Sequence, residues 1–166
     1  MELMIVVAII GVLAAIATYA YSRFTSRAKA TEVNAIFTEL SLRQEQHHLE
    51  HGRYLSTGSS ETDMHPATPS GPDQAQALRP LPDTWDQLRV QTDQNAVYCS
   101  YVAIAGRGGD DSDIGTIAST TFGFEAPMQD WYYLLAECNF DGNPNVNSRY
   151  FTASDRDGMQ VENQGS

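Results

Sequence analysis

The first third of the chain carries an apolar pattern with the period of an α-helix. Residues 3–17 are apolar throughout, and neither proline nor glycine occurs between residues 12 and 51. The pattern predicts one helix from the start of the chain to about Gly52, because glycine is typical of a helix end. After the apolar run, an i, i+3, i+4, i+7 stripe of large apolar residues continues the same period: Val33, Ile36, Phe37 and Leu40.

The predicted helix is too long for the rest of the chain to cover. At a rise of 1.5 Å per residue it would be on the order of 75 Å long. Its first half must therefore be buried by lipid or by copies of itself. In the second half, polar residues such as Glu32 and Glu39 are expected on other faces than the apolar stripe.

Beyond Gly52 the pattern changes to a loop followed by strands. Residues 54–82 are rich in Ser, Thr, Gly, Pro and Asp and show almost no period, which predicts a long loop. Strands are then predicted where β-branched and aromatic residues gather: QLRVQT (87–92), AVYCSYVAIA (96–105), TTFGFEA (120–126), WYYLLAEC (131–138) and RYFTAS (149–154).

Consecutive strands of this kind predict an antiparallel meander that packs on the second half of the helix, and hence an α+β fold. The face of the sheet turned to the helix is expected to carry Tyr101, Ala103, Tyr133 or Leu135. The chain accordingly divides into an N-terminal helix, a connecting loop and a sheet with the C-terminal region: residues 1–52 (with 1–22 as the hydrophobic half, buried by a membrane or by copies of itself), 53–84 and 85–166.

The apolar head also has two simpler interpretations. A secretory signal peptide fits its length, and residues 15–17 offer a small-x-small cleavage site. However, no basic residue precedes the apolar run, and the helical pattern continues past that site. An independent membrane span needs about 20 apolar residues, so the run is slightly short unless Tyr19 and Tyr21 extend it as interfacial anchors.

Charge argues against nucleic acid as a partner. The net charge is −11, whereas nucleic-acid binding depends mainly on Lys and Arg that neutralise phosphates. Basic residues gather just after the apolar run, at Arg23, Arg27 and Lys29, while the chain beyond residue 60 is mostly acidic. This asymmetry predicts a basic collar next to a membrane and an acidic domain that faces outward.

The chain has two cysteines, Cys99 and Cys138. An even count permits a disulfide in an oxidising compartment, and the alternative is a pair of buried free thiols. A bridge would close a loop of about 40 residues, which is worth on the order of 3 to 4 kcal/mol in chain entropy.

The stretch ELMIVVAIIGVLAAIA (2–17) resembles the N-terminal segment of type IV pilins and type II secretion pseudopilins, where a Glu heads a hydrophobic helical stalk. The following YSRFTSRAKATEVN (21–34) is similar to the continuation of that stalk, and residues 136–163 are similar in a looser way to the last sheet of the family. The resemblance implies a loop ordered on the domain surface, and a disulfide that delimits a C-terminal surface loop.

Glu2 is the charged residue that most needs an explanation. A lone carboxylate in hydrocarbon costs several kcal/mol or more, so it persists where it is paired or functional. A simpler alternative places Glu2 at the headgroup boundary, in contact with water. The resemblance implies that Glu2 pairs with the N-terminal amine of a neighbouring subunit, and a buried pair of this kind sets register more reliably than it adds stability.

Two features depart from the family pattern. The leader, the small residue at the cleavage point and the methylated Phe of the family do not precede Glu2, so we expect the sequence to begin inside the motif. Tyr19 stands where relatives commonly have a proline. Because tyrosine is compatible with a helix interior, we predict a continuous stalk, which extended backbone between Gly11 and Tyr21 in a filament would contradict.

Other candidate sites are weaker. His47 and His51 have the i, i+4 spacing of zinc ligands, but without a third ligand we expect a solvated helix end near the negative end of the helix dipole. The turn at residues 139–145 has oxygen donors but few carboxylates, so a plain β-turn is expected rather than a calcium loop: Asn139, Asp141, Asn143 and Asn145. No arrangement of catalytic residues is recognisable, and we expect neither an enzyme nor a bound cofactor.

The resemblance implies a structural subunit of a type IV pilus, a helical homopolymer that serves adhesion or twitching motility. Its partners would be the prepilin peptidase, an inner-membrane assembly platform and an ATPase. The subunit would lie in the bacterial inner membrane before assembly and in the extracellular pilus afterwards. Two alternatives remain open, a pseudopilin of a type II secretion system and a single-pass membrane-anchored periplasmic binding or sensor domain.

Overall fold

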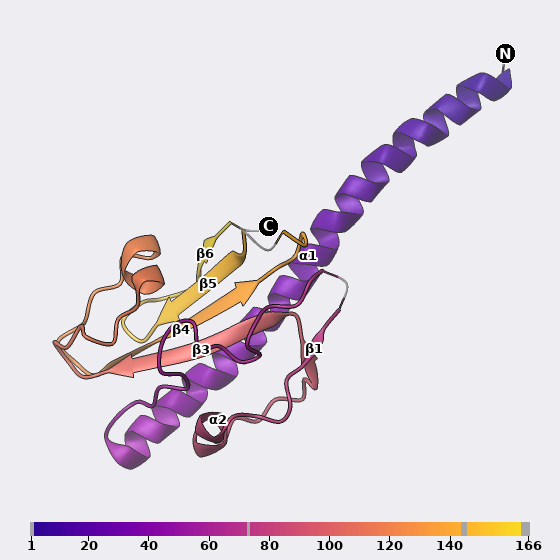
Figure 1. Ribbon diagram of the computed structural model, residues 1–166. Helices are drawn as coiled ribbons and strands as arrows, with labels where there is room; N and C mark the ends of the chain where they lie inside the picture. The colour runs from indigo at the N-terminus through magenta and orange to yellow at the C-terminus, as the bar shows by residue number, and fades with distance from the viewer. Residues whose placement is uncertain (1, 73, 144–145, 164–166) are drawn as a thin grey trace.

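The computed structural model describes residues 2–72, 74–143 and 146–163, without the side chains of residues 2–5, 8, 18–23, 25–27 and 30 in the helix. It has an α+β fold, as the sequence predicts: one long helix, α1 (Glu2–His51), and a four-stranded antiparallel sheet. Figure 1 shows the sheet beside the C-terminal half of α1, while the N-terminal half projects away from it.

α1 is continuous and ends at a glycine. The backbone from Gly11 to Tyr21 is helical. At the other end, Gly52 adopts a left-handed conformation with φ of 71°, and its N–H donates to the carbonyl of His48 at 2.7 Å. A left-handed residue at this position closes the last helical turn and directs the chain back toward the domain.

The main sheet has the strand order β3-β4-β5-β6, all antiparallel: β3 (Cys99–Gly106), β4 (Trp131–Cys138), β5 (Ser148–Ala153) and β6 (Gln160–Glu162). A second, two-stranded sheet joins β1 (Gln76–Ala77) to β2 (Ala96–Val97). The predicted strand at 96–105 covers β2 and all of β3 except Gly106, the one at 131–138 matches β4, and the one at 149–154 covers β5 except Ser148.

Two of the predicted strands are wrong. Residues 87–92 begin at the last residue of the short helix α2 (Asp83–Gln87), and residues 120–126 overlap the π-helical turn η1 (Ile117–Thr121). Both segments bury their apolar side chains without pairing as strands, so composition alone mimics a strand there. The buried residues are Leu88 and Val90 in the first segment and Phe124 in the second.

Both faces of the sheet are buried, and each has its own apolar cluster. On one face, α1 contributes Val33, Ile36, Phe37 and Leu40, which lie in one cluster with Tyr101, Ala103, Tyr132, Leu134 and Ala136. The other face holds Val102, Ile104, Trp131, Tyr133, Leu135 and Phe151, covered by Met64, Ala118 and Phe124 from the loops.

Of the four residues expected to face the helix, only two do so. Tyr101 and Ala103 face the helix, and the Phe37 ring meets the Tyr101 ring edge-on at 6.4 Å between centroids. Tyr133 and Leu135 lie on the opposite face. Because β4 is apolar at successive positions, alternation alone does not distinguish its two faces, and the register with β3 decides them.

The loop between α1 and the sheet is ordered along the outer edge of β3. Thr57 N donates to Ala103 O at 2.8 Å, and Ala103 N donates to the Thr57 hydroxyl at 2.8 Å. Further along, His65 and Tyr101 form a two-way backbone bridge at 2.9 and 3.0 Å. Ala105 N donates to the Ser56 hydroxyl at 2.9 Å. The loop thus satisfies the backbone groups on this edge of β3.

Candidate functional site

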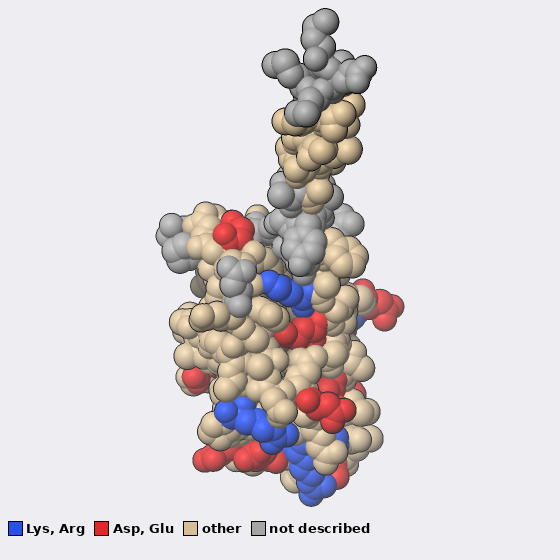
Figure 2. All heavy atoms as spheres, turned by 90° about the vertical axis from the view of Figure 1, so that its right-hand side faces the viewer, with Lys and Arg blue, Asp and Glu red and all other residues tan. Residues whose placement is uncertain are grey.

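The projecting half of α1 presents a continuous uncovered apolar surface in its described residues. From Val6 to Ala17 every described side chain is exposed; Val6 is 54 % and Ile16 is 61 % exposed. Figure 2 shows this half rising above the domain, with only uncharged atoms in the part that is described. Exposed apolar patches of this size mark sites of association with a protein or a membrane.

The second half of α1 is covered by its own chain. Val33 and Leu40 are fully buried in the helix-facing cluster. At the upper limit of this contact, Lys29 donates to the carbonyl of Pro72, and its ammonium group lies 4.6 Å from the centre of the Tyr98 ring. Lys29, expected in a basic collar, is therefore bound to the domain, while the side chains of Arg23 and Arg27 lie outside the described residues.

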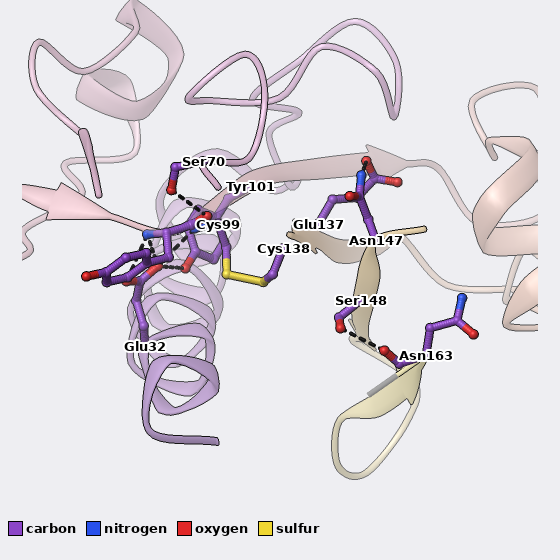
Figure 3. The surroundings of a disulfide bond; sticks show 10 residues. Glu32, Ser70, Cys99, Tyr101, Glu137, Cys138, Asn147, Ser148 and Asn163 are labelled. Carbon is purple, nitrogen blue, oxygen red and sulfur yellow. Dashed lines mark hydrogen bonds between the residues drawn. A yellow bond between two sulfur atoms is a disulfide. The ribbon is translucent and has the colours of Figure 1, made fainter. Parts of the chain in front are cut away.

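Glu32 joins the helix to the start of β3. Its carboxylate accepts backbone N–H groups of Tyr98 at 3.0 and 3.1 Å and of Cys99 at 3.3 Å, and the Tyr101 hydroxyl at 2.6 Å. Figure 3 shows this carboxylate below β3, beside the disulfide. Burial raises the pKa of Glu32 above its ordinary value of 4.5, because desolvation outweighs the lowering by the Tyr101, Tyr98 and Cys99 hydrogen bonds.

The stability that Glu32 contributes through its proton should fall as the pH rises. A carboxyl group with a raised pKa holds its proton more tightly in the folded chain. Its contribution is therefore full below the unfolded pKa and is lost as the pH rises through the folded pKa. As the pH rises above the ordinary carboxyl pKa, the free energy of unfolding of the wild type should decline relative to that of Glu32→Gln. Denaturant unfolding at a series of increasing pH values tests the sign, and a relative gain by the wild type would contradict it.

Two further polar residues of α1 also bind the domain. Glu39 accepts the Gln91 N–H at 2.8 Å and pairs with Arg43 at 2.8 Å. Gln44 is fully buried and makes two bonds with the Leu55 backbone, donating to its carbonyl at 2.5 Å and accepting from its N–H at 2.9 Å. Glu32 and Glu39, expected on other faces than the apolar stripe, thus both bond to backbone groups of the domain.

Cys99 and Cys138 form a disulfide, as predicted. They occupy directly opposite positions of β3 and β4, with 4.4 Å between their Cα atoms. Both side chains are buried in the helix-facing cluster, close to the contacts of Glu32. The bridge joins neighbouring strands of the sheet, whereas the family resemblance implied that it would delimit a C-terminal surface loop.

The remaining predicted sites are placed as follows. The backbone of Glu2 begins α1, and its side chain lies outside the described residues. In the 139–145 turn, the side chains of Asn139 and Asp141 accept backbone N–H groups of Gly142 and Asn143, both at 2.8 Å, and residues 144 and 145 are not described. Across the described ranges, no three His, Cys, Asp or Glu side chains group as metal ligands would.

A search of the described part of α1 and the other helices found none that combines the length and apolar character of a membrane span. Comparisons of the chain with models of protein families, with curated proteins and with solved structures found no match.

Sequence reasoning missed Glu32 and the buried Glu61 as anchoring residues. Glu61 accepts the N–H groups of Ile117 and Ala118 at 2.8 and 2.7 Å, and so holds η1 on the face of the sheet opposite to α1. A Cβ at Gly115 would lie 2.0 Å from the Glu61 carboxyl carbon, so the close approach requires glycine there. The sequence holds one weak indication for Glu32: it directly precedes Val33, the first residue of the predicted apolar stripe.

Proposed function

We propose that this chain is a structural subunit of a type IV pilus filament that polymerises through the first half of α1. The supporting observation is the contrast along one helix. From residue 33 its apolar stripe is buried by the sheet, whereas between Val6 and Ala17 all described side chains are exposed. Copies of the same helix are of the right length and chemistry to cover that surface.

The energetics favour burial of this surface by association. Each large apolar side chain that leaves water contributes roughly 1.5 to 3 kcal/mol, and the exposed stretch has seven such residues: Val6, Val7, Ile9, Ile10, Val12, Leu13 and Ile16. Side-by-side stacking of stalks would bury them in every subunit. Such a stable core requires an energy source for disassembly, which fits an inner-membrane platform and an ATPase as partners.

The fold agrees with this proposal at the level of architecture. A helix whose second half packs on an antiparallel sheet, with a loop ordered along the sheet edge, is the arrangement that the pilin resemblance implies. We extend the proposal to a pilin fold and to Glu2 as the residue that sets the stagger between subunits. The disulfide is consistent with an oxidising, extracytoplasmic location.

Glu2→Ala tests the proposal in cells of the native host. We expect loss of surface filaments containing this chain, with membrane insertion and the folded domain unchanged, because the change removes only the partner of the neighbouring amine. Glu125→Ala, which removes an exposed acid of the domain, is the matched control and should leave filaments at the wild-type level. Electron microscopy of the sheared surface fraction, with immunodetection of the chain, is the measurement.

The other functions predict different outcomes. A wild-type chain that is monomeric in the membrane and indifferent to Glu2→Ala would overturn the proposal in favour of an anchored periplasmic domain. A pseudopilin would be indicated instead if the wild type makes no surface filament and deletion of the gene abolishes protein secretion.

A further inference from the structure

The last two turns of α1 carry a histidine pair whose geometry differs from that of an ordinary solvated helix end. His47 and His51 stand one turn apart on the same helical face. Their imidazole rings are stacked, with 4.3 Å between centroids and 18° between planes. The two imidazole rings therefore lie in direct contact, one above the other.

Both rings are held in one orientation by backbone carbonyl groups. His47 Nδ1 lies 2.8 Å from the Arg53 carbonyl oxygen, and His51 Nδ1 lies 3.2 Å from the His47 carbonyl oxygen. A carbonyl oxygen only accepts, so each Nδ1 must carry the proton, and in the neutral ring the lone pair is then on Nε2. Among the described residues, neither Nε2 has a hydrogen-bond partner.

We propose that His47 and His51 form a two-point chelate for a divalent transition ion, such as Zn²⁺, Ni²⁺ or Cu²⁺, bound through the two Nε2 atoms. Histidine ligands of metals characteristically donate the other ring N–H to a carbonyl or a carboxylate, which fixes the tautomer. The same arrangement is present here before any metal binds. Imidazole pairs suit ions of this class, with Cu²⁺ the tightest.

The surroundings favour a cation. The pair lies in the last turns of α1, where the unpaired carbonyl groups give the helix end a partial negative charge. Nitrogen ligands lie about 2.0–2.1 Å from zinc, so two of them on one ion are on the order of 3 Å apart. The near-parallel rings would tilt toward each other, by rotation of the two side chains, to direct both Nε2 lone pairs at one ion.

The site is open. In the described part of the chain no third His, Cys, Asp or Glu completes a metal cluster, so water would occupy the remaining coordination positions. Such a site binds reversibly and lies at the end of α1 opposite to the apolar half, so it does not depend on the proposed filament.

Metal titration of the purified full-length chain in detergent tests the proposal. Calorimetry with NiCl₂ and with ZnCl₂ should give one site per chain. His47→Ala or His51→Ala should weaken binding roughly 10- to 100-fold, because each leaves a single ligand. The matched control is His48→Ala: its ring stacks on Tyr54 at 4.4 Å, on another face of the same turn, so the affinity should not change.

A second measurement separates metal binding from folding. Saturating Ni²⁺ should raise the melting temperature of the wild type and of His48→Ala, but not that of the His47→Ala/His51→Ala double variant. Circular dichroism without metal should show the same helix content in all variants. Equal affinity in the double variant and the wild type, or a loss in His48→Ala as large as in His47→Ala, would overturn the proposal.

Discussion

Replacement of both Cys99 and Cys138 by alanine should lower the free energy of unfolding by about 4 kcal/mol. The disulfide spans a sequence separation of 39 residues, and its main effect is to restrict the unfolded chain. For a chain of this size, the loss corresponds to a decrease in melting temperature of roughly 10 °C. Guanidinium unfolding of the oxidised wild type and of the double variant, followed by circular dichroism, measures it.

Reduction of the wild-type chain provides the matched control for this prediction. It opens the same loop but keeps both sulfur atoms in the buried cluster, so it separates the chain-entropy effect from the loss of side-chain volume. Hydrogen exchange after reduction should increase in β4 and β5 before it increases in α1. A loss below about 1 kcal/mol in both experiments would show that the loop-closure argument fails here.

Glu32→Ala should destabilise the domain by about 3 kcal/mol, the second largest effect that we expect. The change removes the acceptor of the Tyr98 and Cys99 N–H groups and of the Tyr101 hydroxyl. Donors that lose their partner at a largely buried site cost about 1 to 3 kcal/mol each, reduced where water enters the gap. Thermal and denaturant unfolding at neutral pH provide the measurement.

Two variants test whether this effect belongs to the Glu32 contacts. Tyr101→Phe removes only the hydroxyl partner and should cost about 1 kcal/mol. Asn34→Ala changes an exposed position of the same helix and should be within about 0.5 kcal/mol of the wild type. If Glu32→Ala were as mild as Asn34→Ala, the carboxylate would not anchor the sheet to α1.

The pattern of apolar residues in the sequence predicted four elements of the fold: the long helix α1 and the three apolar strands β3, β4 and β5. The stripe from Val33 to Leu40 identifies the docked face of α1, because its spacing matches only a helix. Residues 87–92 and 120–126 have the composition of strands but are not strands, since their aromatic and β-branched side chains fill the core from turns. β6 has three residues with little apolar character, so its composition carries no strand signal.

The polar contacts were beyond sequence reasoning for a different reason. Glu32 and Glu39 accept backbone N–H groups from segments more than 50 positions away in the chain. Since every residue except proline has a backbone N–H, the amino-acid types do not show which residue is the donor. The cysteine pair was predictable because sulfur chemistry leaves few alternatives. The faces of β4 followed only once Cys138 was placed opposite Cys99.

The covered edge of β3 bears on how copies of this chain meet at high concentration. An open strand edge is a template for amyloid-like growth, in which sheets of different molecules fuse edge to edge. Here Ser56, Thr57 and His65 occupy the donors and acceptors of β3, and β6 on the far side offers only three residues. Neither edge of the four-stranded sheet therefore offers a long open strand for such fusion.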